Sequence, residues 1–181
     1  MSADSAPLVW IDCEMTGLDP ATEALIEVAV LITDSELNIL DDGMQVVIKP
    51  ERSAIENMDP FVVNMHQESG LLAELDSGVT MAEATEQVLT YITERVPEAG
   101  TALLAGNSVG QDKLFLTRDM PAVIEHLHYR IVDVSTVKEL VRRWYPDIYA
   151  NVPEKTGNHR ALGDIQDSIA ELKYYRENVF K

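Results

Sequence analysis

The first apolar segment of the chain ends in two closely spaced acidic residues. Leu8–Met15 has the composition of a buried strand, and Asp12 and Glu14 lie two positions apart within it. Successive side chains of a strand point to opposite faces, so both carboxylates are expected on the same face. Two carboxylates are unfavourable to bury together unless they are protonated or bind cations. Binding of hard divalent ions is the simplest explanation for such a pair. A solvated strand end beside a turn is the alternative for such a pair taken alone.

The later segments predict an α/β domain built on a mixed five-stranded sheet flanked by helices. A turn around Gly17 and Pro20 leads to a second apolar run, which predicts a hairpin and an antiparallel meander. Farther along, strand and helix patterns alternate, which implies parallel pairing. Strands are expected at 8–15, 24–33, 44–49, 101–106 and 131–134, and the longer helices at 80–95, 110–118, 135–144 and 161–178. Asp59 and Ser135 are predicted to cap helices, and residues 146–158 to form an exposed loop.

The size and charge of the chain limit the classes of protein it can belong to. A chain of 181 residues fits a single domain, here expected to span residues 1–181. The net charge of −17 disfavours a protein that grips long nucleic acid, because that grip needs many basic contacts to phosphate. Of the 14 lysine and arginine residues, 11 follow residue 112, so an anionic ligand is expected to meet the second half of the chain or metal ions. An acidic surface that merely favours solubility is the alternative.

The cysteine content and the apolar segments indicate where the protein works. The single cysteine, Cys13, excludes an internal disulfide and a cysteine-rich zinc site, and its apolar neighbours predict burial. The apolar runs are too short to span a bilayer, and residues 1–7 lack the basic and apolar regions of a signal peptide. A cytoplasmic protein without a membrane partner is therefore expected.

Three further residues carry side chains suited to metal or proton chemistry. Asp112 begins the helix after the predicted strand 101–106, and Asp164 lies in the first turn of the last helix. His159 precedes Asp164 by five positions, in a segment rich in turn-forming residues. Each has a simpler interpretation, since acids favour helix N-termini and a histidine can occupy a surface loop without function.

Taken together, these residues fit a phosphodiesterase that uses two metal ions. Ions about 4 Å apart stabilise the attacking and leaving oxygens of an in-line displacement. Asp12, Glu14, Asp112 and Asp164 supply the carboxylate oxygens that hard cations prefer. A histidine with a pKa of about 6.5 in its ordinary state is suited to take a proton from the attacking water, which predicts His159 as the general base.

The order and spacing of these residues resemble the DEDDh exonucleases. That family is named for acids in D-x-E, a later D and H-x4-D, and the chain matches as Asp12-x-Glu14, Asp112 and His159-x4-Asp164. Within it, the chain resembles the oligoribonuclease family over essentially its whole length. The specific strings are WID at 10–12, EMTGLDP at 14–20, GNS at 106–108, DVST at 133–136 and YYRE at 174–177.

The resemblance implies an RNase H-like exonuclease fold, two divalent ions, Mg²⁺ or Mn²⁺, and a homodimer. It also implies that short RNA oligonucleotides, dinucleotides in particular, are degraded from the 3′ end to 5′-mononucleotides. By the same resemblance, Leu18 wedges beside a base and Phe61 stacks on another, where the family often has tryptophan. Gly163 replaces an aspartate found in many relatives, whereas Asp164 keeps the ligand position.

The resemblance also implies a cap for the 5′ phosphate of the substrate. Groups matching His66, Ser108 and Arg130 form that cap in the family, and a tyrosine matching Tyr129 enters the site across the dimer as a catalytic residue. A cap that hydrogen-bonds a terminal phosphate measures length, because a longer chain would have to pass through it. Arg130 is the best single candidate for the phosphate contact. A solvent-exposed arginine and a packing tyrosine are the alternatives.

Two other functions remain as alternatives. The first is a DEDDh exonuclease that acts on longer RNA or DNA ends, which the acidic charge disfavours. The second is a non-catalytic dinucleotide-binding module, whose mark would be a missing ligand or base. All five positions of the motif are filled in this sequence, which disfavours it.

Overall fold

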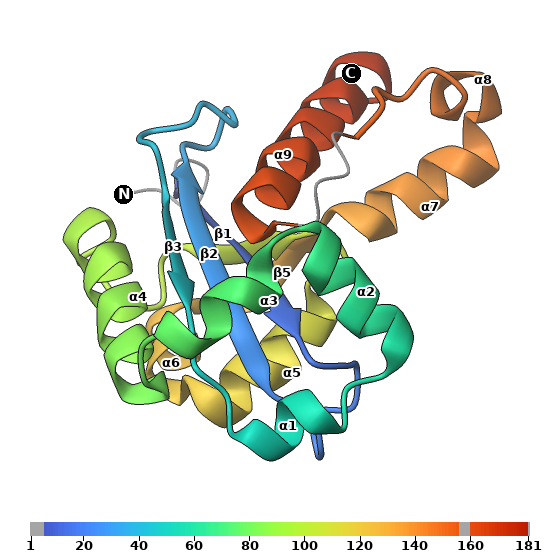
Figure 1. The fold of residues 1–181 in the computed structure, drawn as a ribbon. Coiled ribbons are helices and arrows are strands. Elements are labelled where there is room, and N and C mark those ends of the chain that lie inside the picture. Colours follow the sequence, from blue (N-terminus) through green and yellow to red (C-terminus); the bar gives the residue numbers. More distant parts are fainter. Residues whose placement is uncertain (1–5, 156–159, 181) are drawn as a thin grey trace.

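The computed structural model describes residues 6–155 and 160–180, and within them five strands form one mixed sheet (Figure 1). The strands lie in the order β3-β2-β1-β4-β5. Pairing is antiparallel from β3 through β2 to β1 and parallel from β1 through β4 to β5, as the sequence predicts. Their bounds are β1 Leu8–Met15, β2 Leu25–Thr33, β3 Met44–Val47, β4 Leu103–Gly106 and β5 His128–Asp133.

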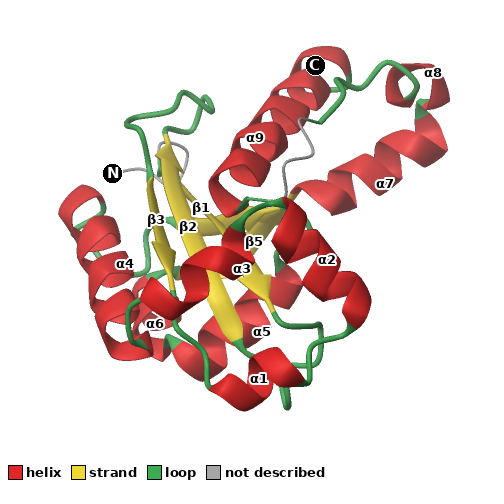
Figure 2. Cartoon of the chain, in the orientation of Figure 1, coloured by secondary structure: helices red, strands yellow, loops and turns green. Residues whose placement is uncertain are grey.

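Helices cover both faces of the sheet (Figure 2). The helices α4, α5 and α6 pack on one face, and α7 and α9 pack on the other. The short helices α1, α2 and α3 follow β3, and α3 packs against one end of β2. The bounds are α1 Arg52–Glu56, α2 Pro60–Glu68, α3 Leu71–Glu74, α4 Met81–Arg95, α5 Gly110–Asp119, α6 Pro121–His126, α7 Val134–Trp144, α8 Pro146–Tyr149 and α9 Ala161–Asn178, with a 3₁₀ turn at Leu75–Ser77.

The alternation of side chains along β1 determines which residues face α9. Val9, Ile11 and Cys13 pack against the layer of α4, α5 and α6, and the burial predicted for Cys13 is confirmed. Trp10 points the other way, into the layer of α7 and α9. Since alternate residues of a strand share a face, Asp12 and Glu14 lie on the side of Trp10, toward α9. The fold therefore turns both acids toward the helix that carries Asp164.

Local signals at helix ends explain where two helices begin. Asp59 caps α2, as the sequence predicts, because its carboxylate accepts a hydrogen bond from the backbone N–H of Phe61. The cap predicted for α7 was wrong by two residues. Asp133 is the cap, since its Oδ1 accepts from the backbone N–H and the hydroxyl of Ser135, which already lies in the first turn.

The loop predicted at 146–158 is partly helical. Pro146 begins the one-turn helix α8, where the missing N–H of proline is tolerated, and residues 150–155 continue as turn and irregular backbone. Residues 156–158 lie outside the described part of the chain. Among the described helices, none combines the length and apolar character needed to cross a bilayer.

Candidate active site

Three carboxylates meet where the end of β1 faces the start of α9. Asp12 and Glu14 come from β1, and Asp164 comes from the first turn of α9. One oxygen from each residue lies within 4.8 Å of the others. The packing of α9 on β1 and β2 brings together acids that are far apart in the sequence. Carboxylate oxygens at this spacing match the ligand preference of divalent cations such as Mg²⁺, Mn²⁺ and Ca²⁺.

Asp112 lies beside these acids and is attached directly to β1. It occupies the first turn of α5 and is buried, and its Oδ1 accepts a hydrogen bond of 3.0 Å from the backbone N–H of Cys13. Cys13 separates Asp12 from Glu14 in the strand. Asp112 is not a member of the tight group of three, but its hydrogen bond to Cys13 holds it beside the two acids of β1.

Burial and mutual repulsion alter the acidity of this centre. Burial, followed by the charges of neighbouring carboxylates, raises the pKa of Asp12 to about 9. The same causes raise the pKa of Glu14 to about 8, although Arg160 opposes the shift. Burial also raises the pKa of Asp112 to about 6, against the lowering effect of its hydrogen bonds to the backbone. Without a cation, Asp12 and Glu14 hold protons near neutral pH, so the site fits divalent-metal binding, which displaces those protons.

Glu27 is a fifth acid of the same region, and sequence reasoning missed it. It is fully buried in β2 and lies directly opposite Glu14 in the register of β1 and β2. Its carboxylate accepts hydrogen bonds from Arg160 and from the backbone N–H of Ala161. The sequence signal that could have revealed Glu27 is an acidic residue inside the otherwise largely apolar segment Leu25–Thr33.

His66 lies next to Glu14, beneath the surface. It belongs to α2, its exposed fraction is 0%, and its Nε2 is 2.9 Å from the carbonyl oxygen of Met15. Its Nδ1 is 3.9 Å from Oε2 of Glu14 and has no hydrogen-bond partner within the part of the chain that the structure describes. The ring therefore contacts the acidic centre from the α2 side, and its predicted contact with a substrate phosphate stays a prediction.

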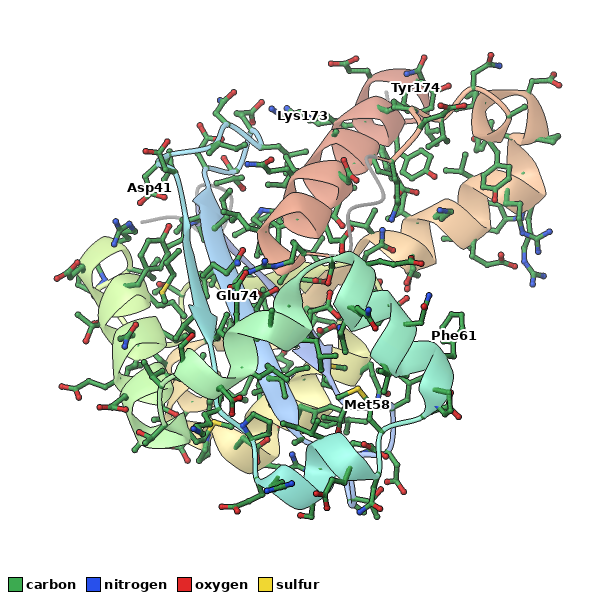
Figure 3. The ribbon with its side chains drawn as sticks, viewed as in Figure 1. Asp41, Met58, Phe61, Glu74, Lys173 and Tyr174 are labelled. Carbon is green, nitrogen blue, oxygen red and sulfur yellow. The ribbon has the colours of Figure 1, made fainter. Side chains whose placement is uncertain are left out.

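Leu18 and Phe61, the residues predicted to contact bases, are both open to solvent. Leu18 is 74% exposed in the turn after β1, and Phe61 is 76% exposed on α2. The Phe61 ring projects outward from the helix (Figure 3). The turn of Leu18 is held against α5, because the side chain of Gln111 donates to the Leu18 carbonyl and that of Arg118 donates to the Pro20 carbonyl. Two apolar side chains are thus presented from anchored elements.

Ser108 and Arg130, the other two residues predicted to cap the phosphate, lie in the turn after β4 and on β5. Ser108 is exposed in the turn between β4 and α5, with a φ of 57°, and its hydroxyl is 3.1 Å from the hydroxyl oxygen of Ser135. Arg130 and Tyr129 are exposed neighbours on β5, joined by a hydrogen bond of 3.0 Å from Nε to the phenol oxygen. Within the described residues, Arg130 and Tyr129 make no hydrogen bond or ring contact with the acidic centre. His159, the predicted base, lies outside the described residues.

A large cavity elsewhere in the molecule is separate from these residues. It has a volume of about 1150 Å³ and lies beside α1 and β3. Its charged lining mixes both signs, with Glu23, Lys49, Arg52 and Arg118 among the described residues. None of the predicted site residues that the structure describes lines it. The acidic centre is therefore identified as the candidate active site by its chemistry and not by the size of a cavity.

Comparison with known proteins defines the class of the chain. The family model described as Exonuclease matches residues 9–172. The Oligoribonuclease of Streptomyces coelicolor is 63% identical over 173 residues, covering 96% of this chain and 86% of the relative. That of Cutibacterium acnes is 61% identical over 170 residues, covering 94% and 84%. The chain therefore belongs to the exonuclease family and, within it, to the oligoribonucleases, which confirms the resemblance inferred from the sequence. It is an exoribonuclease and hence a phosphodiester hydrolase with a nucleic-acid substrate.

Solved structures confirm the fold. Exonuclease I from Methylocaldum szegediense superposes with a TM-score of 0.73 at 19% identity, over 97% of this chain and 41% of that chain. A second Exonuclease I structure gives a TM-score of 0.75 at 16% identity, over 95% of this chain and 41% of that one. The chain thus spans about two fifths of these larger proteins, and the likeness establishes the RNase H-like exonuclease fold.

The raised pKa values predict how stability depends on pH without metal. The folded protein binds protons at Asp12 and Glu14 that the unfolded chain releases above its ordinary carboxyl pKa. The free energy of unfolding should therefore fall as pH rises from about 5 to about 9 in EDTA. We expect Asp12→Asn to weaken this fall and to melt at a higher temperature than the unaltered protein near pH 9. Thermal melts across pH measure both effects.

The exposed Glu98 provides a control for loss of one negative charge. Glu98→Gln should follow the pH profile of the unaltered protein. Identical profiles for Asp12→Asn and Glu98→Gln would contradict the raised pKa of Asp12.

Proposed function

We propose that this protein removes 5′-mononucleotides from the 3′ end of very short oligoribonucleotides, with dinucleotides as preferred substrates. The observation that carries the proposal is the convergence of Asp12, Glu14 and Asp164 within 4.8 Å. Relatives named Oligoribonuclease at 63% and 61% identity support the same substrate class. The net charge of −17 also favours a short substrate, because such a substrate has few phosphates and offers little counterion-release energy.

Two divalent cations, Mg²⁺ or Mn²⁺, are the proposed cofactors. Asp12, Glu14, Asp112 and Asp164 would hold them, and their oxygen donors suit hard cations. When bound, such ions activate the attacking water and stabilise the leaving oxygen of the displaced nucleotide. Exonuclease I from E. coli, which has the same fold, has been solved in a zinc-bound form, and this supports the proposal of a divalent cation.

His159 is the proposed general base, and Tyr129 is the proposed catalytic residue supplied by a second copy of the chain. His159 precedes Arg160, whose guanidinium is bound to Glu27 and Glu74 at the start of α9. A general base must come within hydrogen-bond reach of the attacking water, directly or through one further water. Tyr129 is 73% exposed on β5, which suits a side chain that completes the site of a partner subunit.

Recognition of the substrate is assigned to residues around the acidic centre. Leu18 would wedge beside one base, and the exposed ring of Phe61 would stack on another, with a smaller face than the tryptophan often found in the family. Arg130, Ser108 and His66 are the proposed cap for the 5′ phosphate. A guanidinium supplies charge-assisted hydrogen bonds to phosphate, so Arg130 would carry most of that contact.

The assembly and location follow from the same proposal. A homodimer would bring Tyr129 to the neighbouring site, and residues 1–181 would form one exonuclease domain in each subunit, as the match to residues 9–172 supports. We place its action in the cytoplasm, where short RNA fragments accumulate as RNA is degraded.

A time course on RNA of graded length tests the function. We expect fast hydrolysis of a 5′-phosphorylated dinucleotide in Mn²⁺, slower loss of five nucleotides, little loss of twenty, and no reaction in EDTA. Chromatography of the mononucleotide product measures each rate. Preference for the longest substrate would favour a general exonuclease, and absence of cleavage would favour a binding module.

Replacement of His159 separates a base from a ligand. We expect His159→Ala to lose most of its rate, by about 100-fold or more, while it binds Mn²⁺ as the unaltered protein does. Asp12→Ala should lose both turnover and Mn²⁺ binding. Calorimetric titration with Mn²⁺ measures the binding. Loss of Mn²⁺ affinity in His159→Ala to the same degree as in Asp12→Ala would make His159 a ligand.

Replacement of Arg130 tests the phosphate cap. We expect Arg130→Ala to weaken binding of a 5′-phosphorylated dinucleotide by about 10-fold or more, since a charge-assisted contact is lost. Binding of the same dinucleotide without the phosphate should change little. Arg143→Ala, which removes an exposed arginine of α7, serves as the matched control. Equal affinity of Arg130→Ala for both ligands, at the level of the control, would remove Arg130 from the cap.

A further inference from the structure

The start of α9 is held by a side chain from the sheet. Ala161 is the first residue of α9, and its backbone N–H donates a hydrogen bond of 3.1 Å to Oε2 of Glu27. The residue before it, Arg160, has no acceptor atom with which to cap the helix. Glu27 therefore satisfies one of the N–H groups that the first turn of a helix leaves without a partner inside the helix. The two residues are 134 positions apart in the sequence.

Arg160 forms a second connection between the same elements. Its Nε and Nη2 donate to Oε1 of Glu27 at 3.1 and 2.7 Å. Its Nη1 and Nη2 also donate to the two carboxylate oxygens of Glu74, at 2.8 and 3.2 Å. Glu74 points from α3 toward this junction (Figure 3). One guanidinium thus joins β2, α3 and the start of α9, and its planar fork fixes the direction of each bond.

Glu27 is not placed to act as a ligand of the acidic centre. Both of its oxygens accept hydrogen bonds from Arg160, Ala161 or the side chain of Gln45. It is also not part of the group of acids that converge within 4.8 Å. Because Glu27 faces Glu14 across β1 and β2, its charge repels Glu14, and the Arg160 guanidinium bound to it offsets part of that repulsion. Glu27 is therefore committed to the helix and the arginine.

This junction lies one helical turn from Asp164. The backbone N–H of Asp164 donates to the carbonyl oxygen of Arg160 at 3.1 Å, so the two residues belong to the same turn. A shift or rotation of the start of α9 would move Asp164 relative to Asp12 and Glu14. A displacement of a catalytic group by about 1 Å can lower the reaction rate by about 100-fold.

We propose that Glu27 and Arg160 are positioning residues of the nuclease, which fix the first turn of α9 on β2 and so set the place of Asp164 among the metal ligands. This inference rests on the proposed metal-dependent function. It assigns to Glu27 a role in which it contacts neither substrate nor metal. Glu74 supports Arg160 from the exposed side, where it is 47% accessible.

The test compares direct metal binding with turnover in Glu27→Gln, which keeps the shape of the side chain but removes the charge that Arg160 binds. We expect the Mn²⁺ concentration for half-saturation, measured by electron paramagnetic resonance without substrate, to rise by about 10- to 100-fold. We expect kcat to fall by a similar factor, with the KM for a dinucleotide changed by less than about 3-fold. Glu74→Gln should show the same pattern with a smaller change of about 2- to 3-fold, because Arg160 keeps Glu27.

The matched control is Arg176→Gln, which removes an ion pair between Glu36 and the opposite end of the same helix. It should lose no Mn²⁺ affinity, even if it melts at a lower temperature. Folded Glu27→Gln with the Mn²⁺ titration and kcat of the unaltered protein would overturn the inference. The inference would also be overturned if Glu27→Gln, like Arg176→Gln, lowered only the melting temperature and left Mn²⁺ affinity and kcat unchanged.

Two further arms keep the outcomes distinct. If Glu27→Gln does not fold, Arg160→Lys replaces it in the test. Lysine keeps the positive charge but lacks the planar guanidinium that binds Glu27 and Glu74 together. Unchanged Mn²⁺ affinity and kcat in Arg160→Lys would overturn the inference. If the unaltered protein neither binds Mn²⁺ nor hydrolyses a dinucleotide, the proposed function itself fails. Normal binding and turnover in the unaltered protein with no effect in any variant removes the positioning role alone.

Discussion

The unfavourable energy of like charges held together out of water is the constraint on which the site depends. Asp12, Glu14 and Asp164 converge in a partly buried setting, and burial raises the pKa of Asp12 to about 9. A folded protein can support this arrangement only if protons or cations neutralise the acids. The chemistry that the site is suited to perform, metal-assisted hydrolysis of a phosphodiester, follows from this need for compensation.

The rest of the structure acts mainly to hold these acids at their positions. β1 supplies two of them from the centre of the sheet, where both of its neighbours are hydrogen-bonded, and α5 adds Asp112 through the N–H of Cys13. α9 supplies the last, and its first turn is bound to β2 and α3 through Glu27 and Arg160. Every acid is thus attached to a regular element whose position is fixed by the core.

Leu18, Phe61 and Arg130, which we propose contact the substrate, lie instead on exposed elements. Leu18 and Phe61 are open to solvent on a turn and a short helix, whereas Arg130 lies on the edge strand β5. Stacking surfaces and one arginine can bind a short oligonucleotide without the basic track that a long one needs. This division fits a protein of net charge −17 whose relatives are oligoribonucleases.

The sequence by itself determined the strands, the longer helices and the shared face of Asp12 and Glu14, because periods of 2 and 3.6 residues are local properties of the backbone. It also determined the family, through the spacing of its acids. It misplaced the cap of α7, because Asp133 and Ser135 are both good capping residues and the end of β5 decides between them. Only the tertiary structure decided the role of Glu27, whose partners Arg160 and Ala161 are 133 and 134 positions away. Packing of α9 on the sheet creates those contacts, and no local pattern of side chains encodes them.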